Sequence, residues 1–409
     1  MKTAYEILTS TKKFHISLGL ERVKKVLNLL DNPQEKYECF HIAGTNGKGS
    51  TSKIINDILI ENFKNTDIKT GLFTSPHLFS YTERIKINNK DINTETFNEL
   101  VNFVDELAVK NDIELTEFEI ITVTAFYYFY LEKVKYVVLE TGLGGLLDAT
   151  NVILKPLVCI ITTIDFDHTE RLGKTIEEIA SQKAGIIKEN SNVVISPKNL
   201  GYNRILKTVK DKNAALISIP KVKILRENNI NYACIIDKNR TKKYEFNLLG
   251  SHQADNLALA LSAIKISNLL ISEETIKNAL KNVHWLFRIE YKKDKNLIID
   301  GAHNPSGIMT LRRFLDENFK EEKKCFIFGC LKNKDYKKML KILLTPEDKF
   351  YFFEFNYPNA LKFDELSEEY KNKAIKLTDI NEVKKIIDEN SDLKIVCGSF
   401  YMLGKIFSS

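Results

Sequence analysis

Glycine, lysine and hydroxyl-bearing residues meet in one short segment, Gly44-Thr-Asn-Gly-Lys-Gly-Ser50, which follows an apolar run and precedes a helical pattern. Glycines let a backbone wrap around a phosphate, amides at the start of a helix point toward it, and Lys48 supplies a cation. The strict GxxxxGK[ST] pattern is not met, because Ile42 holds its first glycine position and Gly49 follows the lysine. A Gly/Asn turn with a solvated lysine is the structural alternative, but the strand–loop–helix context favours a phosphate loop.

Three residues with metal-binding side chains follow other apolar runs: Ser75, Glu140 and His168. If these runs are parallel strands, their carboxyl ends lie at one edge of a sheet, and the three side chains can converge there. Mostly oxygen ligands with one nitrogen suit Mg²⁺ or Mn²⁺ better than zinc. Taken singly, each has a structural alternative, as a turn residue, a strand cap and a packed loop histidine respectively. Their shared position beside the phosphate loop favours a divalent cation site.

Lys183 lies on the apolar stripe of a helix predicted over residues 176–188, together with Ile179, Ala180 and Ile187. A lysine in such a place is most often a snorkelling side chain. The alternative is a buried lysine whose pKa falls, leaving a neutral amine open to chemistry. Carbamylation by CO₂ would convert that amine to an anion able to assist metal binding.

The second half of the chain has one comparable segment, Asp300-Gly-Ala-His-Asn-Pro305, again after an apolar run. An Asp/Gly/Asn-Pro turn explains most such sequences, although a turn alone does not need the histidine. Asn256 can be an early-turn cap-type residue and Arg288 a boundary charge, so neither indicates a site by its pattern alone.

The elements that must position these residues alternate between short β-rich runs and longer helical patterns, which is typical of a parallel α/β sheet. In the first half we expect strands at 38–43, 70–74, 136–140 and 158–164, with helices at 48–62 and 116–132. Short antiparallel strands follow at 221–225, 232–236 and 243–246, and then helices at 253–270 and 273–282.

The alternation restarts after residue 284. The expected strands are 296–300, 324–329, 349–355 and 393–397, with helices at 307–318 and 381–389. We therefore expect a phosphate- and metal-binding α/β domain over 1–286, with a small antiparallel subregion at about 221–248, and a second α/β domain over 287–409.

Composition excludes several classes of protein. The 409 residues carry a net charge of +6, without the concentrated basic stripe of a nucleic-acid-binding protein. Hydrophobic residues make up 44% of the chain, which is too apolar for a disordered protein. The six cysteines are scattered without a CxxC pair, so neither a disulfide framework nor a zinc knuckle is indicated. No signal-peptide pattern begins the chain, and the apolar stretch 120–131 is too short to cross a bilayer, so we expect a cytoplasmic protein with no membrane or nucleic-acid partner.

A series of short motifs, in matching order and spacing along nearly the whole chain, is similar to one known family. The motifs are Leu18-Gly-Leu-Glu-Arg-Val23, His41-Ile-Ala-Gly-Thr-Asn-Gly-Lys-Gly-Ser50, Ser75-Pro-His-Leu78, Tyr81-Thr-Glu-Arg84, Phe118-Glu119, Leu139-Glu-Thr-Gly-Leu-Gly-Gly145, Leu147-Asp-Ala-Thr-Asn151, Asp167-His168, Lys183-Ala-Gly-Ile186, Asp300-Gly-Ala-His-Asn-Pro305 and Cys397-Gly-Ser-Phe400. The chain resembles the folylpolyglutamate synthase/dihydrofolate synthase family of the Mur ligase superfamily, and most closely its bifunctional bacterial type. The resemblance implies a Mur-ligase-like α/β fold, with a central P-loop ATPase-type parallel sheet domain and a smaller C-terminal Rossmann-like domain.

The resemblance also implies roles for individual residues. Lys48, Lys183 and His303 are expected to be catalytic, with Lys183 carbamylated and His303 near the reacting phosphate. The residues expected to bind ATP are Thr45, Asn46, Gly47, Lys48, Gly49, Ser50, Asn256, Arg288 and Asp300. Ser75, Glu140 and His168 are expected to hold Mg²⁺. The residues expected near the pterin-bearing substrate are Ser17, Leu18, Gly19, Leu20, Thr116, Phe118, Glu119, Leu147, Asp148 and Ala149.

The activity that the resemblance implies is ATP-dependent amide formation between L-glutamate and dihydropteroate, a reduced folate polyglutamate, or both, through an acyl phosphate. One or two Mg²⁺ ions, a monovalent cation and a monomeric chain are expected. The sequence departs from the family at two places. Leu146 stands where an arginine is usual, and Leu286-Phe287-Arg288 replaces the usual Pro-Gly-Arg.

Three other functions are weighed against this one. A peptidoglycan-precursor ligase usually carries a separate N-terminal nucleotide domain, whereas only about 40 residues precede the phosphate loop here. A kinase or a non-ligase ATPase with a phosphate loop leaves Glu140, His168, Lys183 and the segment at Asp300 unexplained. A binding module fits least well, because it gives the metal-type ligands no role.

Overall fold

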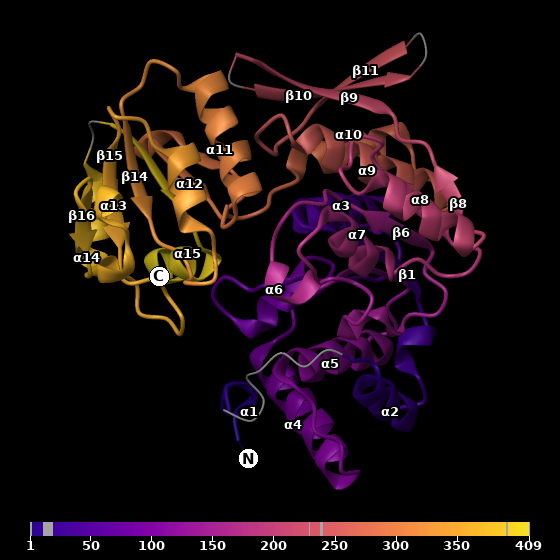
Figure 1. Cartoon of the computed structure of the whole chain (residues 1–409). Coiled ribbons are helices and arrows are strands. Elements are labelled where there is room, and N and C mark those ends of the chain that lie inside the picture. The colour runs from indigo at the N-terminus through magenta and orange to yellow at the C-terminus, as the bar shows by residue number, and fades with distance from the viewer. Residues whose placement is uncertain (1, 11–18, 229, 238–239, 390–391, 409) are drawn as a thin grey trace. The chain divides into compact units, whose positions relative to one another are not determined.

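The computed structural model describes residues 2–10, 19–228, 230–237, 240–389 and 392–408. The chain divides into two compact units, one formed by Met1–Asn247 with Ala254–Val283 and the other by Leu248–Gln253 with His284–Ser409 (Figure 1). Each unit is built on a sheet of its own. The assignment of an ATP-binding domain to 1–286 and a ligase domain to 287–409 stays a prediction.

The first unit contains, within the described residues, an eight-stranded sheet in the order β4-β3-β2-β5-β1-β6-β7-β8. The strands that run parallel are β1 (Glu38–Ala43), β2 (Thr70–Phe73), β5 (Tyr136–Glu140), β6 (Val158–Ile161), β7 (Asn192–Ile195) and β8 (Ala215–Ile217). β3 (Ile85–Ile87) and β4 (Lys90–Asp91) add an antiparallel edge. β1, β5 and β6 are buried along nearly their whole length, as expected for central strands covered on both faces.

The helices of the first unit cover this sheet. They are α1 (Ala4–Leu8), α2 (Glu21–Leu29), α3 (Lys48–Phe63), α4 (Thr94–Lys110), α5 (Glu117–Leu131), α6 (Thr169–Leu172), α7 (Ile176–Ala184), α8 (Tyr202–Asp211), α9 (Gln253–Ile266) and α10 (Glu273–Asn282). α5 is apolar because it is a core helix, in which Phe126 and Phe129 are fully buried. None of the helices in the described part of the chain combines the length and the apolar character needed to span a bilayer.

Several predicted elements are shorter than expected, and three of them end three or four residues early. β6 ends at Ile161, where its ladder with β1 stops because β1 turns into the loop at Gly44. α7 ends at Ala184, before Gly185, rather than at residue 188. α9 ends at Ile266, two residues before Asn268 takes a left-handed φ of 57°.

The predicted antiparallel subregion is confirmed as a small sheet of the first unit. β9 (Lys221–Glu227), β10 (Ile230–Asp237) and β11 (Arg240–Glu245) are arranged with β10 in the middle, and both ladders are antiparallel (Figure 1).

The second unit contains a six-stranded sheet in its described residues, in the order β12-β13-β17-β14-β15-β16. The strands are β12 (Glu290–Lys292), β13 (Leu297–Asp300), β14 (Lys324–Phe328), β15 (Lys349–Phe353), β16 (Ala374–Leu377) and β17 (Leu393–Cys397), and β12 alone among these is antiparallel to its neighbour. Its helices are α11 (Pro305–Asn318), α12 (Tyr336–Leu343), α13 (Glu368–Lys371), α14 (Ile380–Asp388) and α15 (Phe400–Phe407). Phe326, Phe328 and Phe352 fill the core between sheet and helices. The expected α/β architecture, with a mostly parallel sheet in each unit, is confirmed.

Candidate active site

The loop between β1 and α3 has the geometry of a phosphate loop. Gly47 is the N-cap of α3 with a left-handed φ of 87°, and Lys48 is the first helical residue. A Cβ on Gly47 would lie 2.3 Å from Oδ1 of Asn256 on α9, so any side chain at residue 47 would displace the Asn256 side chain. Gly49 and Ser50 are buried in the first turn. The amides of a helix N-terminus and the Lys48 amine thus occupy one loop, which suits an anion.

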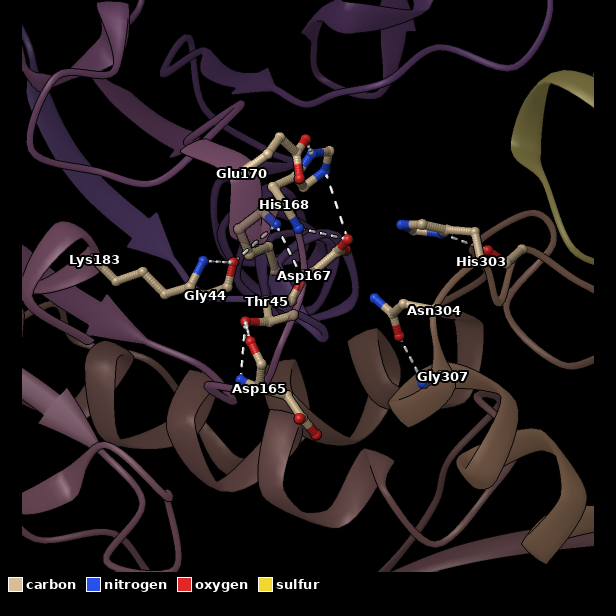
Figure 2. A network of polar contacts seen from close by, with 12 residues as sticks. Gly44, Thr45, Asp165, Asp167, His168, Glu170, Lys183, His303, Asn304 and Gly307 are labelled. Carbon is tan, nitrogen blue, oxygen red and sulfur yellow. Dashed lines mark hydrogen bonds and ion pairs between the residues drawn. The ribbon is translucent and has the colours of Figure 1, made fainter. Parts of the chain in front are cut away.

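Hydrogen bonds connect this loop to the loop after β6. The N–H of Thr45 donates to the carbonyl oxygen of Thr163 at 2.7 Å. The Thr45 hydroxyl donates to the carbonyl oxygen of Asp165 at 3.0 Å, as Figure 2 shows. The carbonyl oxygen of Asn46 accepts from the Thr162 hydroxyl at 2.8 Å. The loop after β6 therefore holds the phosphate loop in a defined shape.

Two lysine amines meet at one backbone oxygen. Nζ of Lys48 and Nζ of Lys183 donate to the carbonyl oxygen of Gly44 at 3.0 and 2.8 Å, and Figure 2 shows Lys183 pointing at that oxygen. Burial, aided by the charge of Lys48 and opposed by Asp167 and Asp148, lowers the pKa of Lys183 to about 7. The side chain is buried rather than snorkelling, and much of its amine is neutral near neutral pH.

The predicted metal ligands lie at the ends of β2 and β5 and in the loop after β6. The N–H of Ser75 donates to Oε2 of the buried Glu140 at 3.3 Å, so these two residues are brought together. His168 has a left-handed φ of 49° and lies 3.9 Å from the carboxylates of Asp167 and Glu170.

Among the described residues, no three His, Cys, Asp or Glu side chains form a cluster that could hold a metal. A site at Ser75, Glu140 and His168 therefore needs the serine hydroxyl as a ligand. A hydroxyl and a buried carboxylate are hard oxygen donors, and this donor set fits Mg²⁺ or Mn²⁺.

The residues predicted near the pterin fall into three segments. Ser17 and Leu18 lie outside the described residues, and Gly19 and Leu20 immediately precede α2. At the start of α5, the Thr116 N–H donates to Oε2 of Glu119 at 2.8 Å and the Glu119 N–H donates back to the Thr116 hydroxyl.

Arg22 is a residue of this region that the sequence alone did not single out. Its Nε lies 3.1 and 3.2 Å from the two carboxylate oxygens of the buried Glu119, and its Nη2 lies 2.9 Å from Oε1. The signal that could have identified it is its place in the motif Leu18-Gly-Leu-Glu-Arg-Val23. The ring of Phe118 packs against Gly142 in the segment after β5. The contact is so close that a Cβ added to Gly142 would lie 2.4 Å from the ring.

Asp148 organises the segment between β5 and β6 from inside. Its carboxylate accepts hydrogen bonds from the Leu143 N–H at 2.7 Å and from the Thr150 hydroxyl at 2.6 Å. That hydroxyl lies 2.9 Å from Nε2 of the buried His41 on β1. Burial raises the pKa of Asp148, although these hydrogen bonds oppose the shift. In the same segment Leu147 is exposed and Ala149 is buried.

The second unit carries its predicted site residues at the end of β13. The Asp300 carboxylate accepts from the Ile289 N–H at 2.7 Å and from the Ala302 N–H at 2.8 Å. Burial raises the pKa of Asp300 to about 6, against the opposing charge of Arg288. Nδ1 of His303 lies 2.9 Å from the carbonyl oxygen of Gly301.

Asn304 connects this segment to α11. It is the N-cap of the helix, and its side-chain oxygen accepts from the Gly307 N–H at 2.8 Å (Figure 2). The Asp300-Gly-Ala-His-Asn-Pro305 segment is thus a strand–turn–helix junction in which the histidine is half-buried.

The chain matches two known protein families. Residues 42–264 match the Mur ligase middle domain, and residues 285–409 match the dihydrofolate synthetase C-terminal domain. The dihydrofolate synthase/folylpolyglutamate synthase of Bacillus subtilis is 34% identical, over 99% of each chain. The dihydrofolate synthetase of Saccharomyces cerevisiae is 32% identical, over 96% of this chain and 97% of that one.

Solved structures show the same relationship. E. coli FolC in complex with DHPP and ADP superposes with a TM-score of 0.87 at 26% identity, covering 99% of this chain and 97% of that chain. The bifunctional folylpolyglutamate synthase/dihydrofolate synthase of Yersinia pestis, complexed with AMPPNP and Mn ion, gives 0.85 at 28% identity, covering 99% and 97%. The phosphate loop, the fold of both units and these similarities lead to one conclusion: the chain belongs to the dihydrofolate synthase/folylpolyglutamate synthase family of Mur ligases.

Proposed function

We propose that this protein joins the amine of L-glutamate to the carboxylate of dihydropteroate, of a reduced folate polyglutamate, or of both. It is an ATP-dependent acid–amino-acid ligase of folate metabolism. The observation that carries the proposal is the loop at Gly44–Ser50, in which the Lys48 amine and the N-terminus of α3 lie beside the buried amine of Lys183.

The chemistry explains why such a loop is needed. A carboxylate is a poor electrophile, so the γ-phosphoryl group of ATP is first transferred to it, with ADP as the leaving group. The glutamate amine then attacks the acyl phosphate, loses a proton, and inorganic phosphate departs. Two anions must approach each other in the first step, so Lys48 and the α3 amides act by neutralising charge and by positioning.

A divalent cation contributes to the same neutralisation, and Ser75, Glu140 and His168 would hold it. A related bifunctional synthase has been solved with Mn, AMPPNP and L-glutamate bound, and we infer that Mg²⁺ is the physiological ion here. One or two such ions and a monovalent cation are part of the proposal.

The remaining nucleotide contacts are assigned to both units. Thr45, Asn46, Gly47, Gly49, Ser50 and Asn256 belong to the first unit, and Arg288, Asp300 and His303 belong to the second. In this assignment Arg288 and Asp300 contact ATP and His303 lies near the phosphate that reacts.

The acceptor is placed among the segments at 17–20, 116–119 and 147–149. E. coli FolC binds DHPP, and we assign the pterin of the acceptor to Gly19, Leu20, Thr116, Phe118, Glu119, Leu147, Asp148 and Ala149, with Ser17 and Leu18 outside the described residues. The protein works as a cytoplasmic monomer on small molecules, without a nucleic-acid or membrane partner.

Lys183 is proposed to be carbamylated. Its neutral amine attacks the carbon of CO₂, one proton leaves, and the product is an anionic carbamate. Bicarbonate should restore activity after decarbamylation at low pH, and small carboxylic acids should partly restore Lys183→Ala. If neither addition has an effect, Lys183 acts as a simple amine.

The decisive experiment measures phosphate release from purified protein with ATP and Mg²⁺, with each acceptor supplied separately. The expected result is release that requires both glutamate and an acceptor. In the presence of glutamate, phosphate release with dihydropteroate as the acceptor identifies a dihydrofolate synthase. Release with a reduced folate as the acceptor identifies a folylpolyglutamate synthase. Release that does not depend on glutamate would overturn the proposal in favour of a kinase or an ATPase.

A further inference from the structure

Phe400 is the first residue of α15 and closes the motif Cys397-Gly-Ser-Phe400, to which no function has been assigned above. Its side chain is buried, with 7% of the residue exposed. The guanidinium carbon of Arg288 lies over the ring, 4.5 Å from its centroid. The imidazole of His303 lies at 5.5 Å from the same centroid, tilted by 57°. One buried ring therefore contacts two residues that the proposed function places at ATP.

The ring of Phe400 also explains why residue 301 is a glycine. A Cβ on Gly301 would lie 1.9 Å from Cε1 of Phe400, well inside van der Waals contact. No left-handed φ is found at Gly301, so space rather than backbone conformation requires glycine there. Because Gly301 separates Asp300 from the pair Ala302-His303, the ring also limits the path of this segment.

The backbone around Arg288 is held in an uncommon conformation. Phe287 and the β-branched Ile289 both have left-handed φ values, 56° and 47°. The Phe287 carbonyl oxygen accepts from the Gly301 N–H at 2.8 Å, and the Ile289 N–H donates to Asp300 at 2.7 Å. Backbone strain of this kind persists only where the surroundings over-determine it. The base of the Arg288 side chain is thus fixed, and the ring of Phe400 supports its far end.

We propose that Phe400 is a positioning residue, whose ring holds the Arg288 guanidinium and the His303 imidazole in the orientation in which they meet the phosphates of ATP. The inference rests on the proposed function and adds to it a residue that contacts neither nucleotide nor acceptor. An aromatic face attracts a guanidinium and reduces the number of rotamers that the arginine side chain explores.

Removing the face while keeping an apolar side chain tests this role. Phe400→Leu should lower kcat roughly 10- to 100-fold and raise the KM for ATP, as expected when a contact group is misplaced by about 1 Å. The KM for the folate acceptor and for glutamate should stay within about twofold. Phe400→Tyr keeps the ring face and should retain most of the activity.

Phe326→Leu is the matched control, because it removes a fully buried ring from β14 in the same unit. It should lower the melting temperature and leave kcat and the KM for ATP unchanged. If Phe326→Leu changes the kinetics as much as Phe400→Leu does, the effect is general loosening of the unit. The proposal is then wrong.

A double-mutant cycle tests the contact with Gly301. Gly301→Ala should lower kcat in the wild-type background, because the new methyl group displaces the ring. In a Phe400→Ala background, the same substitution should change kcat by less than about threefold. If the fold-losses in kcat of the two single variants multiply in the double variant, the ring and Gly301 act independently. That result contradicts the proposal.

A readout without turnover separates this inference from the proposed function. In the full chain, the ring current of Phe400 should shift the NMR signals of the Arg288 guanidinium and the His303 Cε1–H, assigned with Arg288→Lys and His303→Gln. Phe400→Tyr should keep these shifted positions and Phe400→Leu should lose them. Wild-type protein without ligase activity but with these shifts would overturn the proposed function alone, whereas an active enzyme whose signals do not respond to Phe400→Leu would overturn the positioning role alone.

Discussion

Lys183 shows how burial, aided by a neighbouring positive charge, can lower the pKa of a lysine side chain. Its amine donates to the Gly44 carbonyl oxygen at 2.8 Å, next to the Lys48 amine that uses the same acceptor. Desolvation and a neighbouring positive charge both disfavour the ammonium form. The proposed carbamylation needs a neutral amine, and the lowered pKa of Lys183 is consistent with it.

The first prediction concerns stability and pH. The pKa of Lys183 is about 7 in the folded protein and 10.5 for a free lysine, so between these values the unfolded chain binds a proton that the folded protein has lost. The free energy of unfolding, relative to that of Lys183→Met, should therefore rise as the pH increases from 7 to 9. Urea unfolding of both proteins, in CO₂-free buffer without metal, measures this difference in the free energy of unfolding at each pH. A difference that stays constant with pH would contradict the assigned pKa.

The second prediction concerns Lys48. Lys48→Ala should fold normally, because the side chain is half-buried and alanine is well tolerated in the first turn of α3, yet it should release no phosphate. The expected loss of transition-state stabilisation is about 3–4 kcal/mol or more, the scale of one oxyanion donor. Turnover near the wild-type rate, with circular dichroism confirming the fold, would refute the assignment of the phosphate loop.

The third prediction concerns Phe287, where this chain departs from the usual glycine. Phe287 is buried against Phe407 although its φ is 56°. Phe287→Ala and Phe287→Gly both lose the ring, but only glycine relieves the left-handed backbone. Phe287→Gly should therefore be at least as stable as Phe287→Ala.

Phe314 provides the control for this comparison, because it is equally buried but lies within α11. There alanine should be more stable than glycine by roughly 0.5–1 kcal/mol. The same order of stability at both positions in thermal unfolding would show that the backbone at Phe287 is not strained.

Helices α2 and α5 are joined by a contact that links two predicted substrate segments. The Arg22 guanidinium holds the buried Glu119 carboxylate, which also receives the Thr116 N–H at the start of α5. α2 begins directly after Leu20, so the orientation of α2 on α5 sets where that segment lies.

The fourth prediction follows from this ion pair. Arg22→Met leaves a carboxylate buried without its cation and should destabilise the protein by about 2–3 kcal/mol. Glu119→Gln retains an acceptor for the Thr116 N–H and should cost less. The double substitution should cost clearly less than the sum, and an additive result in a double-mutant cycle would show that the two residues do not cooperate.

Element prediction succeeded where local patterns are strong. β1, β5, α10 and β17 have the predicted bounds, because each is a buried run or an amphipathic helix with clear end signals. α4 was not predicted, although its buried Phe97, Val101, Val104 and Ala108 recur at helical spacing after the N-cap Asn93. The antiparallel edge β3–β4 was also missed, because two- and three-residue strands carry too little pattern to be recognised.

At the scale of the whole molecule, each unit contains hydrophobic core of its own. Phe126 and Phe129 belong to a core cluster of the first unit, and Phe326, Phe328 and Phe352 belong to a core cluster of the second. Because domains with a core of their own can in principle fold alone, we expect each unit to unfold as one cooperative unit.

The fifth prediction is that calorimetry of the ligand-free protein shows two transitions. Phe326→Leu should lower the temperature of one of them by roughly 4 °C or more per kcal/mol of destabilisation. Ile160→Val, in the centre of β6, should lower the other. A single transition that both substitutions shift equally would show that the units unfold together.

By itself, the sequence determined the family to which the chain belongs and which residues are candidates for chemistry: a predicted phosphate loop, predicted oxygen-rich metal ligands and a lysine on an apolar stripe. These are local properties, because glycine content, side-chain type and helical spacing can be read within a few residues of each other. The tertiary structure decided which of these groups meet. Strand order places β1 between β5 and β6, and only that order brings Gly44 beside the loop at Thr162–Asp165. Packing likewise turned the carboxylate of Glu119 inward, since its partner Arg22, 97 positions earlier, is supplied by the fold and not by neighbouring residues.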